Sequence, residues 1–264
     1  MLLETNTPVL TPIIQAVVPE DSNAHVSKWL SHGTTPVLNK IEIPEDARVF
    51  VGGDLHGERA RLIMRLVELG FDFKKDVFVC TGDLINKGAD SLNTLRLLNE
   101  RWFFSVRGNH EELALDTLIL KCPWKLQEWH KRGGEWFGRL KGVDKHEAEE
   151  LILERVSKLP LAIELNVRGK RFGITHGDYN ANEWSLDQLS RTQLLNGLTT
   201  DRTLANQVLR KKGKSLPSVA GLDGIYHGHT SFKHYASAGN RHWIDTKGHA
   251  TGNLTVIELA PTLN

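Results

Sequence analysis

The chain has 264 residues, of which 40% are hydrophobic and 25% are charged. This balance, without any low-complexity tract, excludes a mainly disordered chain and is enough for one large domain or two small ones. The 33 basic residues nearly equal the 32 acidic ones, which argues against a dedicated nucleic-acid-binding or membrane-surface protein.

Residues 1–47 hold five of the nine prolines of the chain. Proline removes a backbone donor and biases the preceding residue toward extended geometry. We therefore expect residues 1–47 to form a Pro-rich arm with one short helix at about 23–32. A single domain is expected to follow, over residues 48–264.

From residue 48 the pattern changes to strand, turn and helix, repeated in series. Short apolar strands are predicted at 48–53, 76–81 and 102–106, and helices with apolar stripes at 58–69, 91–99 and 111–120. This order is βαβαβ, so the strands should be parallel. The sequence thus predicts an α/β fold with a βαβαβ N-terminal half.

The second half of the chain is less regular. Helices are predicted within 124–158, a hairpin at 161–167 and 170–175, and short strands at 224–227, 241–245 and 254–259. Residues 199–222 include a basic run at 210–214, and we expect them to form a mobile loop at the rim of the site.

Polar, glycine-containing turns follow each strand of the βαβαβ unit, and two later strands end in histidine-containing turns. Because the carboxyl ends of parallel strands meet at one edge of a sheet, these side chains should converge. The set is Asp54, His56, Asp83, Asn109, His176 and His229.

Mixed nitrogen and oxygen donors suit manganese, iron or zinc and exclude a soft thiolate site. Six ligands exceed one tetrahedral centre but match two metals that share a carboxylate. Two metals ~3.5–4 Å apart can bind both the attacking and the leaving oxygen of a phosphoryl displacement. Any one turn alone could be an ordinary helix cap, but five at this spacing favour a metal site.

Three motifs carry a family resemblance: Gly-Asp-Leu-His-Gly at 53–57, Gly-Asp at 82–83 with Gly88, and Arg-Gly-Asn-His-Glu at 107–111. Together they resemble the phosphoprotein phosphatase family of metallophosphoesterases, and especially its bacterial and bacteriophage lambda-type protein phosphatases. The segments 176–179 and 228–230 resemble later motifs of that branch. The resemblance covers about 48–259 and implies a calcineurin-like β-sandwich of mixed sheets flanked by helices.

The resemblance also implies two divalent metal ions, usually manganese, although iron and zinc suit the same donors. In the family pattern Asp54 and His56 bind one ion, Asn109, His176 and His229 bind the other, and Asp83 bridges the two. Such enzymes hydrolyse phosphomonoesters by direct attack of a metal-bound hydroxide, without a covalent intermediate.

Other residues are expected to handle the phosphate and the leaving group. His110 follows a metal ligand directly, so its ring should reach the leaving oxygen as general acid. Arg107 and Asn109 are expected to bind phosphate, Arg107 through its two-pronged guanidinium. For a second phosphate-binding arginine we favour Arg191, with Arg202 as a rival.

The chain departs from the family pattern at Asn86 and Lys87, where the family has Asp-Arg. That aspartate usually pairs with the acid histidine, and that arginine usually holds phosphate. We expect Asn86 to accept an N–H of His110 through its amide oxygen, without supplying a charge. Residues 247–249 also differ from the family.

The predicted function is a metal-dependent phosphoprotein phosphatase acting on Ser/Thr phosphate, with Tyr phosphate as a further substrate. Its partner would be a phosphorylated protein or a small phosphoester. One alternative is a dinucleoside polyphosphate hydrolase, because a bacterial branch of the superfamily also lacks the Asp at position 86. A second alternative is an inactive metal-bound recognition module.

Two features indicate a cytoplasmic protein with no membrane partner. The only cysteines, Cys80 and Cys122, are too few for a disulfide framework, which suits a reducing compartment. No apolar run approaches the ~20 residues of a membrane-spanning helix, and the N-terminus lacks the basic segment of a signal peptide.

Overall fold

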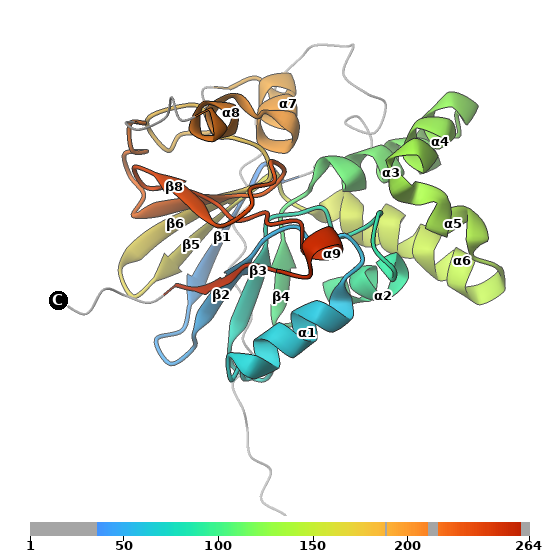
Figure 1. Ribbon diagram of the computed structural model, residues 1–264, viewed down its shortest axis with the longest axis horizontal. Helices are drawn as coiled ribbons and strands as arrows, with labels where there is room; N and C mark the ends of the chain where they lie inside the picture. Colours follow the sequence, from blue (N-terminus) through green and yellow to red (C-terminus); the bar gives the residue numbers. More distant parts are fainter. Residues whose placement is uncertain (1–35, 188, 211–215, 260–264) are drawn as a thin grey trace, which may run out of the picture.

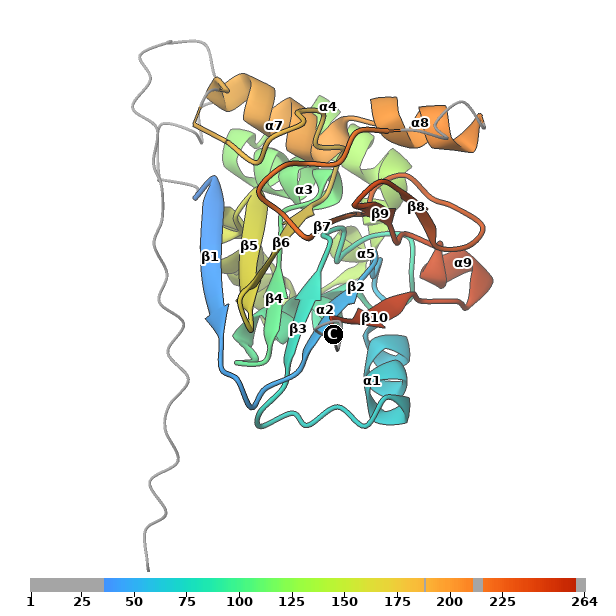
Figure 2. The ribbon, with the colours of Figure 1, turned by 90° about the vertical axis from the view of Figure 1, so that its left-hand side faces the viewer.

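The computed structural model describes residues 36–187, 189–210 and 216–259. Within these residues the strands form two mixed sheets that pack face to face, with helices on the outer sides (Figures 1 and 2). The predicted α/β sandwich is thereby confirmed. The helix expected at 23–32 lies outside the described residues.

The smaller sheet contains the three strands of the predicted βαβαβ unit. Strands β2, β3 and β4 are parallel, and β10 joins β2 in the antiparallel direction. The strand order is β10 (Val256–Glu258), β2 (Val49–Gly52), β3 (Val77–Cys80) and β4 (Phe103–Ser105).

The larger sheet is built around the predicted hairpin of β5 and β6, which is antiparallel. Strand β7 is parallel to β6 and to β9. The strand order is β1 (Leu38–Ile43), β5 (Ala162–Val167), β6 (Lys170–Thr175), β7 (Gly224–His227), β9 (Arg241–Trp243) and β8 (Ala236–Ala238).

Strand β1 falls within the segment that we expected to be an arm. It pairs in parallel with β5, from Leu38 opposite Ala162 to Ile43 opposite Val167. The burial of Ile41 and Ile43 on either side of the exposed Glu42 supplies the alternation of a strand. This part of the chain therefore belongs to the domain, and the division at residue 47 does not hold here.

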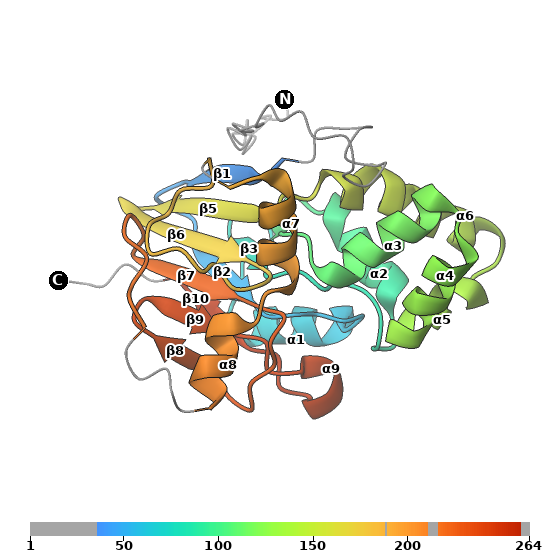
Figure 3. The same ribbon diagram turned by 90° about the horizontal axis from the view of Figure 1, so that it is seen from above.

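Helices cover both outer faces of the sandwich. Figure 3 shows those of residues 109–150 gathered to one side of the sheets. The smaller sheet packs against α1 (Arg59–Glu68), α2 (Ser91–Arg96), η2 (Leu97–Asn99), α3 (Asn109–Leu120), α4 (Pro123–Trp129), η3 (His130–Gly134), α5 (Glu135–Arg139), α6 (Gly142–Glu150), η4 (Leu151–Arg155) and η5 (Val156–Lys158). A single helical turn, α9 (Gly248–Thr251), precedes β10.

The larger sheet is covered by α7 (Arg191–Thr200) and by α8 (Thr203–Leu209), and α8 lies within the segment 199–222 where we expected a loop. The prediction of a mobile loop at 199–222 is thus wrong for these residues. Ser190 and Gln193 form a capping box at the start of α7, which is a recognisable sequence pattern. Residues 211–215 of the basic run lie outside the described residues.

A buried carboxylate ties the starts of β2 and β3 together. Asp76 accepts bonds from the Arg48 backbone N–H at 3.0 Å, from Arg48 Nη2 at 2.6 Å and from the Asp72 N–H at 2.9 Å. Burial alone would raise the pKa of Asp76, but the bonds from Arg48 outweigh it and hold the pKa below its usual value.

We expect Asp76→Asn to lower the free energy of unfolding by ~1.5–3 kcal/mol at pH 7, the usual worth of hydrogen bonds to a charged group. Because the folded-state pKa is depressed, this stabilisation exists above the unfolded value of ~3.9 and is lost as the pH falls below it. Urea unfolding at pH 7 and pH 3 measures the difference.

A matched control is Asp46→Asn, since Asp46 pairs with Lys75 at the surface, with its side chain 72% exposed. Its effect on unfolding should be close to zero. Equal effects of the two substitutions would contradict this account of Asp76.

Candidate active site

The turns at the carboxyl ends of the strands bring all six predicted metal-binding residues to one edge of the sandwich. They come from the turns after β2, β3, β6 and β7 and from the start of α3. Five are buried and Asn109 is partly exposed. The residues are Asp54, His56, Asp83, Asn109, His176 and His229.

These turns hold the backbone in an unusual conformation. His56, Asp83 and His229 have φ values of 45°, 48° and 61°, in the left-handed region that costs a non-glycine residue ~1–3 kcal/mol. Gly108 leaves room for the central carboxylate, because a Cβ there would lie 2.2 Å from Asp83 Oδ1. The fold stores strain where it places these ligands.

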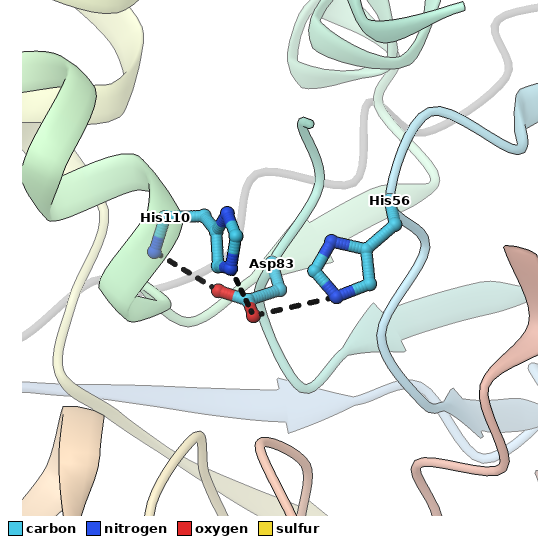
Figure 4. Close-up of side chains that lie close together, drawn as sticks. All are labelled: His56, Asp83 and His110. Carbon is cyan, nitrogen blue, oxygen red and sulfur yellow. Dashed lines mark hydrogen bonds and ion pairs between the residues drawn. The ribbon is translucent and has the colours of Figure 1, made fainter. Parts of the chain in front are cut away.

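Asp83 lies between His56 and His110 (Figure 4). Its Oδ2 is 3.5 Å from His56 Nε2 and 3.8 Å from His110 Nε2. The other ring nitrogen of His56, Nδ1, is 3.0 Å from the Ile85 carbonyl and donates to it. His56 Nε2 therefore keeps its lone pair and points it at Asp83 and, at 4.0 Å, at Asp54.

His176 is the centre of the second group of ligands. Its Nδ1 lies 2.8 Å from the Thr81 carbonyl oxygen, which accepts a hydrogen bond from the Nδ1–H group. Its Nε2 is 3.2 Å from Asp83 Oδ1, 3.1 Å from Asn109 Oδ1 and 3.1 Å from His229 Nδ1. Several lone pairs thus face one another across this group.

This donor set fits two cations that share Asp83. Ligands bound ~2.1 Å from one octahedral ion lie ~3 Å apart, close to the spacing around His176. Burial lowers the pKa of His56 and of His229 to about 3, so both rings are neutral and can ligate at pH 7. Burial, then the Asp245 and Asp83 carboxylates, raises the pKa of Asp54.

Two positively charged side chains border this cluster. Lys87 Nζ lies 2.9 Å from His56 Nε2. Arg202 Nε lies 2.8 Å from His229 Nε2. Arg191 is the first residue of α7, and its side chain is not described. The structure therefore places Arg202, the rival in the sequence analysis, beside the ligands.

The comparisons with known proteins agree with this geometry. The sequence profile described as calcineurin-like phosphoesterase matches residues 47–251. The chain belongs to the calcineurin-like phosphoesterase family. It is 34% identical over 223 residues to serine/threonine-protein phosphatase 1 of Salmonella typhimurium strain LT2, covering 84% of this chain and 97% of that protein.

Two further matches support the family and the fold. Serine/threonine-protein phosphatase 2 of Escherichia coli K12 is 33% identical, covering 83% of this chain and 96% of that protein. A crystal structure described as a candidate diadenosine tetraphosphatase matches with a TM-score of 0.58 and 21% identity, covering 84% of this chain and 93% of that one. The structural match shows the fold alone.

Arg107 occupies a different place in this phosphoesterase from the one we expected. Its guanidinium is fully buried, and Nη2 donates to the carbonyls of Ser157 at 2.6 Å and Leu159 at 3.2 Å. Nη1 lies 3.4 Å from Glu112 Oε2. These contacts favour a packing role over phosphate binding, because the guanidinium already donates hydrogen bonds to backbone carbonyls at and just after η5.

Asn86 also differs from the expectation. Its amide nitrogen, not its oxygen, faces His110, with Nδ2 2.7 Å from Nδ1. Its oxygen accepts from the indole nitrogens of Trp129 at 3.0 Å and Trp136 at 2.9 Å. The sequence held no signal for this, since the tryptophans lie 43 and 50 residues away.

Glu111 holds the turn that carries Asp83, a role that sequence analysis missed. Its Oε1 accepts from the backbone N–H groups of Leu84 at 2.8 Å and Ile85 at 3.3 Å. Its Oε2 accepts from the Gly108 N–H at 3.0 Å. One buried carboxylate thus joins the turn after β3 to the start of α3.

We expect Glu111→Gln to weaken manganese binding by ~10–100-fold, as is usual when the hydrogen bonds that position a metal ligand are lost. A glutamine amide keeps one acceptor oxygen but turns an NH₂ group toward another N–H. Isothermal titration calorimetry with manganese measures the affinity. In the control, Glu112→Gln, the altered residue faces Arg107 instead, and binding should change less than twofold. Unchanged affinity in folded Glu111→Gln would contradict the role.

Proposed function

We propose that this phosphoesterase is a metal-dependent phosphoprotein phosphatase that hydrolyses serine, threonine and tyrosine phosphate. The observation that carries the proposal is that the ligand groups around His56 and His176 share Asp83, with His110 on the same carboxylate. The relatives named serine/threonine-protein phosphatase, matched over nearly their whole length, support the substrate class.

The ions would be held by the residues predicted from the sequence, and we propose that both are manganese. When bound, such ions activate water and neutralise phosphate charge. The chain's own contribution is to hold Asp83 between the two groups. Glu111 holds the turn that carries Asp83 by accepting a hydrogen bond from the Leu84 backbone N–H. His110 donates its backbone N–H to Asp83 Oδ1 at 3.1 Å.

Several side chains are placed to bind the substrate. Asn109 turns its amide oxygen toward His176, which leaves its NH₂ group to donate to a phosphate oxygen. Arg202 and Lys87 bring positive charge to either side of the cluster. His110 Nε2 faces the cluster and would meet the leaving oxygen.

The substrate would be a phosphorylated protein or a small phosphoester, and we propose a cytoplasmic location. Both cysteines are free: Cys80 is buried in β3 and Cys122 is half-buried, which suits a reducing compartment. Within the described residues no helix has the length and apolar character needed to cross a membrane.

Asn86 keeps the dinucleoside polyphosphate hydrolase as a second candidate, because the superfamily branch with that activity also lacks an aspartate at this position. The competing substrates are a phosphopeptide and diadenosine tetraphosphate, each offered with manganese. A phosphatase should hydrolyse the phosphopeptide far faster. Faster turnover of the dinucleotide would support the second candidate, and no hydrolysis of either substrate or of p-nitrophenyl phosphate would support a recognition module.

Asp83→Asn should reduce kcat with manganese by ~10³-fold or more, because it removes charge from both ligand groups at once. The loss should be larger than the loss that Asp54→Asn causes. Both variants should stay folded, since asparagine preserves the size of each side chain. Steady-state kinetics on p-nitrophenyl phosphate, with metal content by atomic emission, compares them. Full activity of Asp83→Asn would refute the shared carboxylate.

A further inference from the structure

The side-chain amide of Asn86 is bound at both ends. The residue is fully buried, and its backbone N–H donates to Ser91 Oγ at 2.9 Å. Its amide oxygen receives two indole N–H groups, from Trp129 and Trp136, while its amide nitrogen contacts His110 Nδ1. The two tryptophan rings are perpendicular, at 89°, and converge on the one oxygen.

The orientation of this amide follows from donor chemistry. An indole nitrogen can only donate, so the atom facing both tryptophans must be the oxygen. The reverse orientation would place an NH₂ group against two N–H donors and leave them buried without acceptors. The NH₂ group of Asn86 must therefore point at His110.

This contact determines which nitrogen of His110 carries the proton. An NH₂ donor 2.7 Å from Nδ1 requires a lone pair on Nδ1. The ring proton is then on Nε2, which faces the metal-binding cluster. A doubly protonated ring would set an N–H against the N–H of Asn86, and the two tryptophans prevent the amide from turning to relieve it.

We propose that Trp129 and Trp136 are positioning residues that, through Asn86, hold His110 as a neutral ring with its proton on Nε2, so that the enzyme selects aryl phosphoesters such as phosphotyrosine. This inference rests on the proposed phosphatase function and specifies its substrate class.

The selectivity follows from where the electrons go. The oxygen of water bonds to phosphorus as the P–O bond to the leaving group breaks, so the phosphoryl group passes to water and the electron pair of the broken bond passes to the leaving oxygen. A phenolate, whose conjugate acid has a pKa of ~10, holds that pair with only a hydrogen bond from Nε2–H. The far more basic serine alkoxide must take a proton, and a neutral imidazole does not release one readily. Aryl esters are thus hydrolysed with full support from the site and alkyl esters are not.

Nitrogen NMR of ¹⁵N-histidine-labelled protein, without metal, tests the positioning directly. We expect His110 to show an unprotonated Nδ1 and a protonated Nε2. In Asn86→Asp the carboxylate keeps both indole bonds and accepts from the ring, so Nδ1 should become protonated. Replacing Trp129 and Trp136 together by Phe should let the amide turn and mix the two tautomers.

Trp124→Phe is the matched control, because Trp124 is 59% exposed and is not among the partners of Asn86. It should leave the His110 signals unchanged. A protonated Nδ1 in the natural protein would overturn the proposal, as would tautomers that do not respond to Asn86→Asp.

Activity gives the second, independent readout. With manganese, the natural protein should hydrolyse a phosphotyrosine peptide at least ~10-fold faster than the phosphoserine peptide of the same sequence, since general-acid help is worth ~10²–10⁴-fold and only part of it is missing. Asn86→Asp should raise kcat on the phosphoserine peptide by ~10-fold or more and leave p-nitrophenyl phosphate within twofold.

The two readouts separate the two proposals. The expected tautomer without hydrolysis of either peptide would refute the phosphatase function while leaving the positioning intact. Hydrolysis of both peptides at equal rates, or a phosphoserine kcat that Asn86→Asp leaves unchanged or lowers, would refute the substrate selection.

Discussion

The carboxylate of Asp83 is the group on which the rest of the site depends. One oxygen faces His176 at 3.2 Å, and the other faces His56 at 3.5 Å. The fold accepts a left-handed backbone at Asp83 and a glycine at 108 to place this group where two strands end side by side. Glu111 offsets part of this backbone strain, because its carboxylate accepts hydrogen bonds from three backbone N–H groups around the turn.

Much of this arrangement could be predicted because it depends on local patterns in the amino-acid sequence. Apolar runs ending in glycine-containing turns define β2, β3 and β4, and the parallel order then carries Asp54, Asp83 and Asn109 to one edge. The same reasoning failed for β1, because its short alternation of buried and exposed residues lies within a proline-rich stretch. It failed for α8, because this helix lies within 199–222, a basic and glycine-containing stretch that we expected to be a loop.

The contacts that the sequence could not supply are long-range polar ones. Arg107 stands in a motif that suggested phosphate binding, yet its guanidinium binds carbonyl groups near Ser157, about fifty residues away. Asn86 was expected to accept a hydrogen bond from His110 and instead donates one, because Trp129 and Trp136 bind its oxygen. Sequence spacing gives the place of a side chain, but its hydrogen bonds depend on what packs behind it.

The shared carboxylate can be observed most directly by electron paramagnetic resonance of the manganese-loaded protein, with metal analysis of the same sample. Two ions per chain with the spectrum of an exchange-coupled pair are predicted, and Asp83→Ala should replace that spectrum with the signal of isolated ions. A single bound ion per chain, or two ions without coupling in the natural protein, would contradict the account.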